Sequence, residues 1–146
     1  MSLLLKKRVD VLDETVLFLN SLMGEIEFSR MNITDIIFSF SSGEAMKNLS
    51  YLNEIHHSDD QYDFHGQWKS SLSSFAYYKS SEKNKMLQLG DFLGTTDMCD
   101  QINIIRLYLS FFEKFRSNAV SEYEKYGKIS SLLGLFTGAS VFILLL

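Results

Sequence analysis

The sequence predicts an all-α fold, a helical bundle of about six helices followed by a C-terminal transmembrane helix. Apolar residues recur at helical spacing along most of the chain. The 146 residues include no proline, which interrupts helix interiors, and the last eighteen residues, 129–146, carry no charge. With 46% hydrophobic residues the chain can bury one core. We therefore expect a helical domain over residues 1–126 and a membrane anchor over 127–146.

Net charge and cysteine content restrict the classes of protein to which the chain can belong. The net charge of −4 and the pI of about 5.3 give no basic surface for nucleic acid. The single cysteine, Cys99, excludes an internal disulfide and fits a reducing compartment. These observations favour a cytosolic domain that does not bind nucleic acid.

Residues 9–26 predict the first helix. Apolar residues alternate steps of three and four, which places them on one helical face: Val9, Leu12, Val16, Leu19, Met23 and Ile26. Leu17, Phe18 and Leu22 widen this face, so the helix is expected to pack on more than one neighbour.

Shorter segments follow. After a break at 29–34, Asn32 or Thr34 can cap a short helix that runs through Phe40. Residues 41–43 break the chain again before a helix expected over 45–55. The polar stretch 56–66 predicts a loop, and helical spacing returns at 68–76, where Trp68 is expected in the core. A further helix is expected over 80–92.

The longest predicted helix follows a turn at 93–96. Asp97 can cap it by accepting hydrogen bonds from free backbone amides, and Asp100 adds negative charge at the positive end of the helix dipole. Its apolar face comprises Ile105, Leu109, Phe112, Phe115, Ala119, Tyr123 and Tyr126. Gly127 is expected to let the chain bend before the final apolar segment.

Residues 129–146 predict a transmembrane helix. Eighteen residues at 1.5 Å each span about 27 Å, close to the roughly 30 Å of a bilayer's hydrocarbon core. The alternative, a buried helix of a soluble protein, rarely ends in six apolar residues such as 141–146. Lys125 and Lys128 precede the segment and favour a cytosolic position for the helical domain. Membrane lipid is therefore an expected partner.

Small residues recur within this segment at Ser130, Gly134 and Gly138. The Gly134–Gly138 pair forms a GxxxG pattern, which allows two membrane helices to approach closely. We therefore predict that these three residues pack membrane helices, for example in a homo-oligomer. The alternative is a helix that merely tolerates small residues.

Histidines and aspartates that could form a metal site lie close together in the sequence, at His56, His57, His65, Asp59, Asp60 and Asp63. Zinc sites need ligands held at fixed spacing on ordered structure. Here the histidines lie in a polar stretch without a cysteine, which favours a solvated loop.

No nucleophile or phosphate site is predicted. Cys99 falls in the first turn of a helix, where its pKa could be lowered, but a catalytic thiol also needs a base that the sequence does not identify. The spacing Gly90-x-x-x-Gly94 lacks the lysine of a phosphate-binding loop. We expect no catalytic residue, no cofactor and no metal.

One motif lies at the end of the 80–92 helix. Residues 89–97 read Leu-Gly-Asp-Phe-Leu-Gly-Thr-Thr-Asp, and Gln101 follows four residues later. This run resembles the pattern Phe-Gly-x-x-Leu-Gly-x-x-Asp-x-x-x-Gln of the stage III sporulation protein AB family, with Leu89 in place of the usual Phe. The run 126–134, Tyr-Gly-Lys-Ile-Ser-Ser-Leu-Leu-Gly, is similar to the family's entry into the membrane. Glu25-Ile26 and Trp68 also match.

The resemblance covers about residues 8–146 and implies a non-catalytic helical domain similar to the cytoplasmic domain of the type II secretion platform protein F. It implies a role in endospore formation, in the channel complex between mother cell and forespore. There the domain would dock a secretion-type ATPase, stage III sporulation protein AA, at the mother-cell membrane, beside other sporulation channel subunits. Two family features are missing, namely an N-terminal membrane helix and prolines after the first helix.

Gly94, Asp97 and Gln101 are the candidate partner-binding residues, because they belong to the part of the chain that matches the family best. Helix capping is the alternative explanation for Asp97 and Gln101. The alternative function is a platform-type subunit of a type II secretion or type IV pilus machine. A small integral-membrane enzyme would need ionisable residues in its membrane segment, and 129–146 has none.

Overall fold

The computed structural model describes the backbone of residues 2–29, 31–55 and 63–145, and within these ranges the side chains of 3–138. This part of the chain is helical, as predicted. It forms five α-helices and one 3₁₀ helix: α1 (Ser2–Phe28), α2 (Ile33–Ser41), η1 (Ser50–Glu54), α3 (Phe64–Ser73), α4 (Ser80–Phe92) and α5 (Met98–Leu145).

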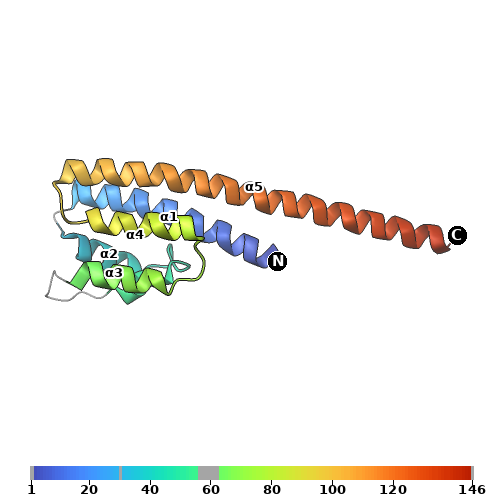
Figure 1. Ribbon diagram of the computed structural model, residues 1–146, viewed down its shortest axis with the longest axis horizontal. Coiled ribbons are helices and arrows are strands. Elements are labelled where there is room, and N and C mark those ends of the chain that lie inside the picture. The colour runs from blue at the N-terminus through green and yellow to red at the C-terminus, as the bar shows by residue number, and fades with distance from the viewer. Residues whose placement is uncertain (1, 30, 56–62, 146) are drawn as a thin grey trace.

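The two long helices organise the fold. α1 and α5 lie side by side and run in opposite directions, and α4 packs along α5 (Figure 1). α2, η1 and α3 form a second layer below them, with α3 against α4 and α2 against α1 (Figure 1). The C-terminal part of α5 continues well past this bundle, so the turn between α4 and α5 lies at the opposite end of the molecule (Figure 1).

α1 confirms the predicted first helix and begins earlier, at Ser2. Leu12 and Leu19 are fully buried, as expected, together with Phe18 and Leu22. Leu17 is 43% exposed, so its predicted place on the packed face is wrong. The reason is geometric, since Leu17 precedes buried Leu19 by two residues, which is about 200° around an α-helix.

Trp68 lies at the centre of the core, as predicted. Its indole stacks on Phe18 with ring centroids 6.4 Å apart and meets Tyr51 edge-on at 6.0 Å. The indole nitrogen Nε1 donates a hydrogen bond of 2.8 Å to the carbonyl of Met86 in α4. A Cβ atom built on Gly90 would lie 2.2 Å from Trp68 Cδ1. Gly90 is therefore required because the indole occupies the space of a side chain.

Three buried hydroxyl groups, of Thr15, Tyr51 and Tyr78, form hydrogen bonds with one another inside the core. The Tyr78 hydroxyl lies 2.6 Å from Thr15 Oγ1 and 2.9 Å from the Tyr51 hydroxyl, and Thr15 Oγ1 lies 2.8 Å from the carbonyl of Val11. Burial raises the pKa of the Tyr51 hydroxyl well above its ordinary value, and burial also raises the pKa of Tyr78. These partners satisfy the hydroxyl groups inside an otherwise apolar core.

A nearly buried ion pair connects α1 to α4. The Arg8 guanidinium donates two parallel hydrogen bonds to Glu82, of 3.1 and 3.0 Å, and the side chains are 11% and 3% exposed. Glu82 Oε1 also accepts a bond of 2.9 Å from the Lys79 amide, which satisfies a free donor at the start of α4. The pair therefore joins the two helices and caps one of them.

The helix predicted over 45–55 is not an α-helix. Residues 42–48 form turns, and only the 3₁₀ helix η1 follows. Leu49, Leu52 and Ile55 are buried at intervals of three residues, which is the period of a 3₁₀ helix rather than of an α-helix. Backbone bonds from Leu52 to Leu49 (3.1 Å) and from Ile55 to Leu52 (3.4 Å) follow the same interval.

The prediction of a transmembrane helix over 129–146 is wrong. No helix in the described part of the chain is both long and apolar enough to cross a membrane. The segment is the end of α5 rather than a separate helix, because α5 passes through Gly127 without the expected break.

The loss of this span also affects the predicted packing residues. Ser130, Gly134 and Gly138 lie on the last part of α5, where every described side chain from 127 to 138 is exposed. Their predicted role in packing membrane helices depended on the membrane span and loses its basis with it.

Candidate docking site

The turn between α4 and α5 depends on a left-handed glycine. Gly94 has a φ of +79°, which residues with a side chain rarely adopt. The amide of Leu93 bonds to the carbonyl of Leu89 at 3.2 Å, and the amide of Thr95 bonds to that of Phe92 at 3.3 Å. α4 therefore ends at Phe92, and Gly94 redirects the chain into α5.

The side chain of Gln101, near the start of α5, bonds to the backbone of this α4–α5 turn. Its Nε2 donates to the carbonyl of Thr96 at 2.8 Å, and its Oε1 accepts from the amide of Gly94 at 3.2 Å. Asp97 Oδ1 accepts from the amide of Asp100 at 2.9 Å, which confirms the predicted helix cap. Because both ends of the Gln101 amide are bonded, the turn has a fixed shape.

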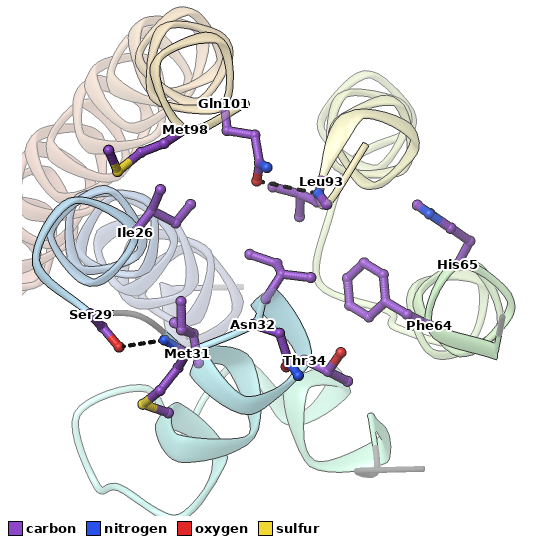
Figure 2. Close-up of a pocket in the computed structure, with 13 residues that line it drawn as sticks. Ile26, Ser29, Met31, Asn32, Thr34, Phe64, His65, Leu93, Met98 and Gln101 are labelled. Carbon is purple, nitrogen blue, oxygen red and sulfur yellow. Dashed lines mark hydrogen bonds between the residues drawn. The ribbon is translucent and has the colours of Figure 1, made fainter. Parts of the chain in front are cut away.

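A half-open pocket of about 450 Å³ lies beside this turn. Leu93, Gly94 and Gln101 border it on one side. The rest of the lining comes from α1, α2, α3, the loop between α1 and α2, and Met98 of α5. Figure 2 shows Met98 and Ile26 across from Phe64 of α3. Its volume falls within the range of about 300–1,000 Å³ that is usual for binding pockets.

The polar groups around the pocket are largely engaged in local bonds. Ser29 Oγ accepts from the amide of Met31 at 3.0 Å (Figure 2), and Asn32 Oδ1 accepts from the amide of Asp35 at 2.9 Å. Gln101 is bonded as described above. Among the described residues that line the pocket, none is Asp, Glu, Lys or Arg. The pocket therefore presents apolar side chains together with polar groups that are mostly bonded locally.

Two of the three candidate partner-binding residues, Gly94 and Gln101, line the pocket. Asp97 does not line it and is exposed beside it. Cys99 is also exposed. The structure therefore gives each candidate residue a structural task in the turn and brings two of them to one cavity.

Of the six residues weighed for a metal site, the structure describes two, His65 and Asp63. His65 lies in α3 and lines the pocket, where its ring meets Phe64 edge-on at 5.3 Å. Asp63 lies at the start of α3. The remaining four lie outside the described residues, namely His56, His57, Asp59 and Asp60. In the described part of the chain no group of three or more such side chains could hold a metal ion.

The sequence did not identify four apolar residues that shape the pocket: Ile26, Met31, Phe64 and Met98. A signal for one of them was present, because Met31 lies in a polar break between helices and outside any helical seam. Met98 lies seven residues before Ile105, on the same face of α5, so its spacing is that of a core residue. Its place at the pocket follows only from the fold.

Comparison with known proteins gives a family. The family model of stage III sporulation protein AB matches residues 1–146, the whole chain. Neither curated proteins nor solved structures gave a match. The likeness to the cytoplasmic domain of the type II secretion protein F therefore stays a prediction.

Proposed function

The chain belongs to the stage III sporulation protein AB family, and we propose that in stage III of sporulation it acts as a non-catalytic scaffold of the channel complex. In this role it docks a secretion-type ATPase, stage III sporulation protein AA. The docking surface is the α4–α5 turn together with the pocket beside it.

The observation that carries this proposal is the fixed shape of the turn next to an apolar cavity. Gln101 bonds both Gly94 and Thr96, so the backbone there is held before a partner arrives. A surface that is already ordered loses less entropy on binding than a flexible loop does. The turn also lies at the end of the bundle opposite the C-terminus of α5, where the long helix leaves it uncovered (Figure 1).

A scaffold also fits the chemistry of the pocket. Among its described lining residues, His65 is the one with an ionisable side chain. A hydrolytic or transfer site would need a nucleophile and a base within hydrogen-bond distance of each other. An apolar cavity with few free polar groups is better suited to holding a partner side chain.

The experiment compares two amide-to-alanine substitutions on α5. Gln101→Ala removes both bonds to the turn, whereas Asn103→Ala changes an exposed amide two residues further along. We expect Gln101→Ala to weaken binding of the purified ATPase about tenfold or more, equivalent to about 1.4 kcal/mol. Asn103→Ala should leave binding within about twofold of the wild type.

Thermal unfolding of each variant checks that it is folded before binding is measured. Absence of binding between the wild-type chain and the ATPase at micromolar concentrations would refute the docking function. Equal binding by both variants would place the ATPase on another surface.

A further inference from the structure

Large apolar side chains are exposed at the pocket and beside it. Met31 and Met98 line the pocket and are 46% and 50% exposed, and Phe28, at the end of α1, is 86% exposed. Figure 2 shows Met98, Ile26 and Met31 along one side of the pocket. Methionine is flexible and polarizable, so it adapts to the shape of a partner. Met31 and Met98 therefore offer exposed apolar surface at the pocket that a protein partner can cover.

The segments that build the pocket are acidic. Residues 25–36, 63–65 and 91–101 contain seven carboxylates and one basic residue, Arg30, which lies outside the described residues. The carboxylates are Glu25, Glu27, Asp35, Asp63, Asp91, Asp97 and Asp100. All but Asp35 are exposed, and Asp91 is already paired with Lys69 of α3 at 3.7 Å, so the other exposed carboxylates carry the negative charge of the rim. The surroundings of the pocket therefore attract positive charge.

The centre of the site is apolar by comparison. Ile26, Phe64 and Leu93 face the cavity (Figure 2), and the Gln101 amide is already bonded within its own turn. An apolar centre with a charged rim is the usual arrangement of a protein–protein contact. A polar ligand of similar size would find few free hydrogen-bond groups there.

We propose that this pocket receives a large apolar side chain of a partner segment whose neighbouring residues are Lys or Arg. The inference rests on the proposed docking function and specifies the chemistry that the docking partner presents. The apolar side chain fills the cavity against Met31 and Met98, and the basic residues lie over the carboxylates of α1 and α5. Binding then depends on salt through the rim and on side-chain volume through the centre.

Two synthetic helical peptides test this chemistry on the full chain. One carries Leu on one face and Lys elsewhere, and the other has Glu in place of every Lys. With methionine methyl groups labelled for NMR, the Leu/Lys peptide should shift the signals of Met31 and Met98 and leave that of Met86, which is fully buried in the core. The Leu/Glu peptide should bind about tenfold more weakly or worse.

Paired variants locate the contact. Glu27→Lys should weaken Leu/Lys binding about threefold at low salt, whereas Glu113→Lys makes the same change in net charge at an exposed position of α5 outside the pocket. Met31→Gln combined with Met98→Gln should weaken it about tenfold. Leu107→Gln, which alters an apolar residue that is 53% exposed elsewhere on α5, should not weaken it.

Equal weakening by Glu27→Lys and Glu113→Lys would overturn the proposal, because attraction would then follow net charge alone. Shifts that spare both Met31 and Met98 would also overturn it. The ATPase provides a separate readout. If it binds the wild type and the pocket variants equally, the pocket chemistry is wrong and the docking function remains. If the Leu/Lys peptide occupies the pocket and the ATPase does not bind the wild type, the docking function is wrong.

Discussion

The contact between Gly90 and Trp68 gives the sharpest test of the packing. A methyl group at position 90 would lie 2.2 Å from Trp68 Cδ1 and 2.4 Å from Nε1, distances that no pair of unbonded atoms sustains. In Gly90→Ala the indole must move, and its 2.8 Å hydrogen bond to the carbonyl of Met86 is then lost or lengthened.

The magnitude follows from three terms. Overpacking a core typically costs about 1–3 kcal/mol, and the lost hydrogen bond costs about 1 kcal/mol more. Replacing a helical glycine with alanine contributes about 1 kcal/mol in the opposite direction. We therefore expect Gly90→Ala to lower the free energy of unfolding by about 1–3 kcal/mol and the melting temperature by about 3–10 °C.

Gly24 in α1 provides the matched control, because a Cβ atom there would meet no atom within 4 Å. Gly24→Ala should therefore raise stability by up to about 1 kcal/mol through helix propensity alone. Urea unfolding measures both variants, and the fluorescence of Trp68, the single tryptophan, reports its surroundings directly. If Gly90→Ala were as stabilising as Gly24→Ala, with unchanged Trp68 emission, the packing described here would be incorrect.

Two further predictions concern charged and titratable groups in the core. Glu82→Gln should lower the free energy of unfolding, measured with urea, by about 3 kcal/mol, because it leaves the nearly buried Arg8 without its counter-charge. Asp91→Asn removes an exposed ion pair and should lower it by less than about 1 kcal/mol. Equal losses of stability in the two variants would contradict the buried geometry of the Arg8–Glu82 pair. Burial raises the pKa of Tyr51 and Tyr78, so above the unfolded value of about 10 the unfolded state loses protons that the folded state keeps. These two groups should therefore leave the free energy of unfolding unaffected below about pH 10, and the free energy of unfolding should fall as the pH rises above that value. If it were the same at about pH 9 and about pH 11, the burial of both hydroxyl groups would be contradicted.

Periodicity predicted the helices well where one face is buried. α1, α4 and α5 were predicted because the residues that pack on neighbours recur at the α-helical step, as Leu12, Leu19 and Phe112 do. It failed at Leu49, Leu52 and Ile55, whose spacing of three residues was assigned to an α-helix although it is the period of η1. The pattern of a short apolar segment does not by itself separate these two helices.

The candidate site was predicted in part. Asp97 as a helix cap follows from local chemistry, because a carboxylate before a helix accepts from its free amides. The bonds from Gln101 to Gly94 and Thr96 depend on how the turn folds back over α5, which sequence spacing does not specify. The pocket was not predicted, since it forms between α1, α2, α3 and α5 and brings Ile26 and Phe64 together only in the folded chain.

The prediction of a transmembrane helix at the C-terminus was wrong because it relied on the absence of charge alone. The run 129–146 has no charge, yet α5 extends through it from a charged segment, and no described helix meets the requirements of a membrane span. The absence of charge established apolar character and did not establish a separate spanning helix.

Hydrogen exchange of the full chain with and without the purified ATPase tests the central claim most directly. The account predicts that added ATPase slows amide exchange in two segments together, residues 31–36 and 93–101, because both border the same pocket. Amides in the middle of α5, such as 110–118, should exchange at unchanged rates. Protection confined to that middle segment, with residues 93–101 unaffected at saturating ATPase, would contradict docking at the α4–α5 turn.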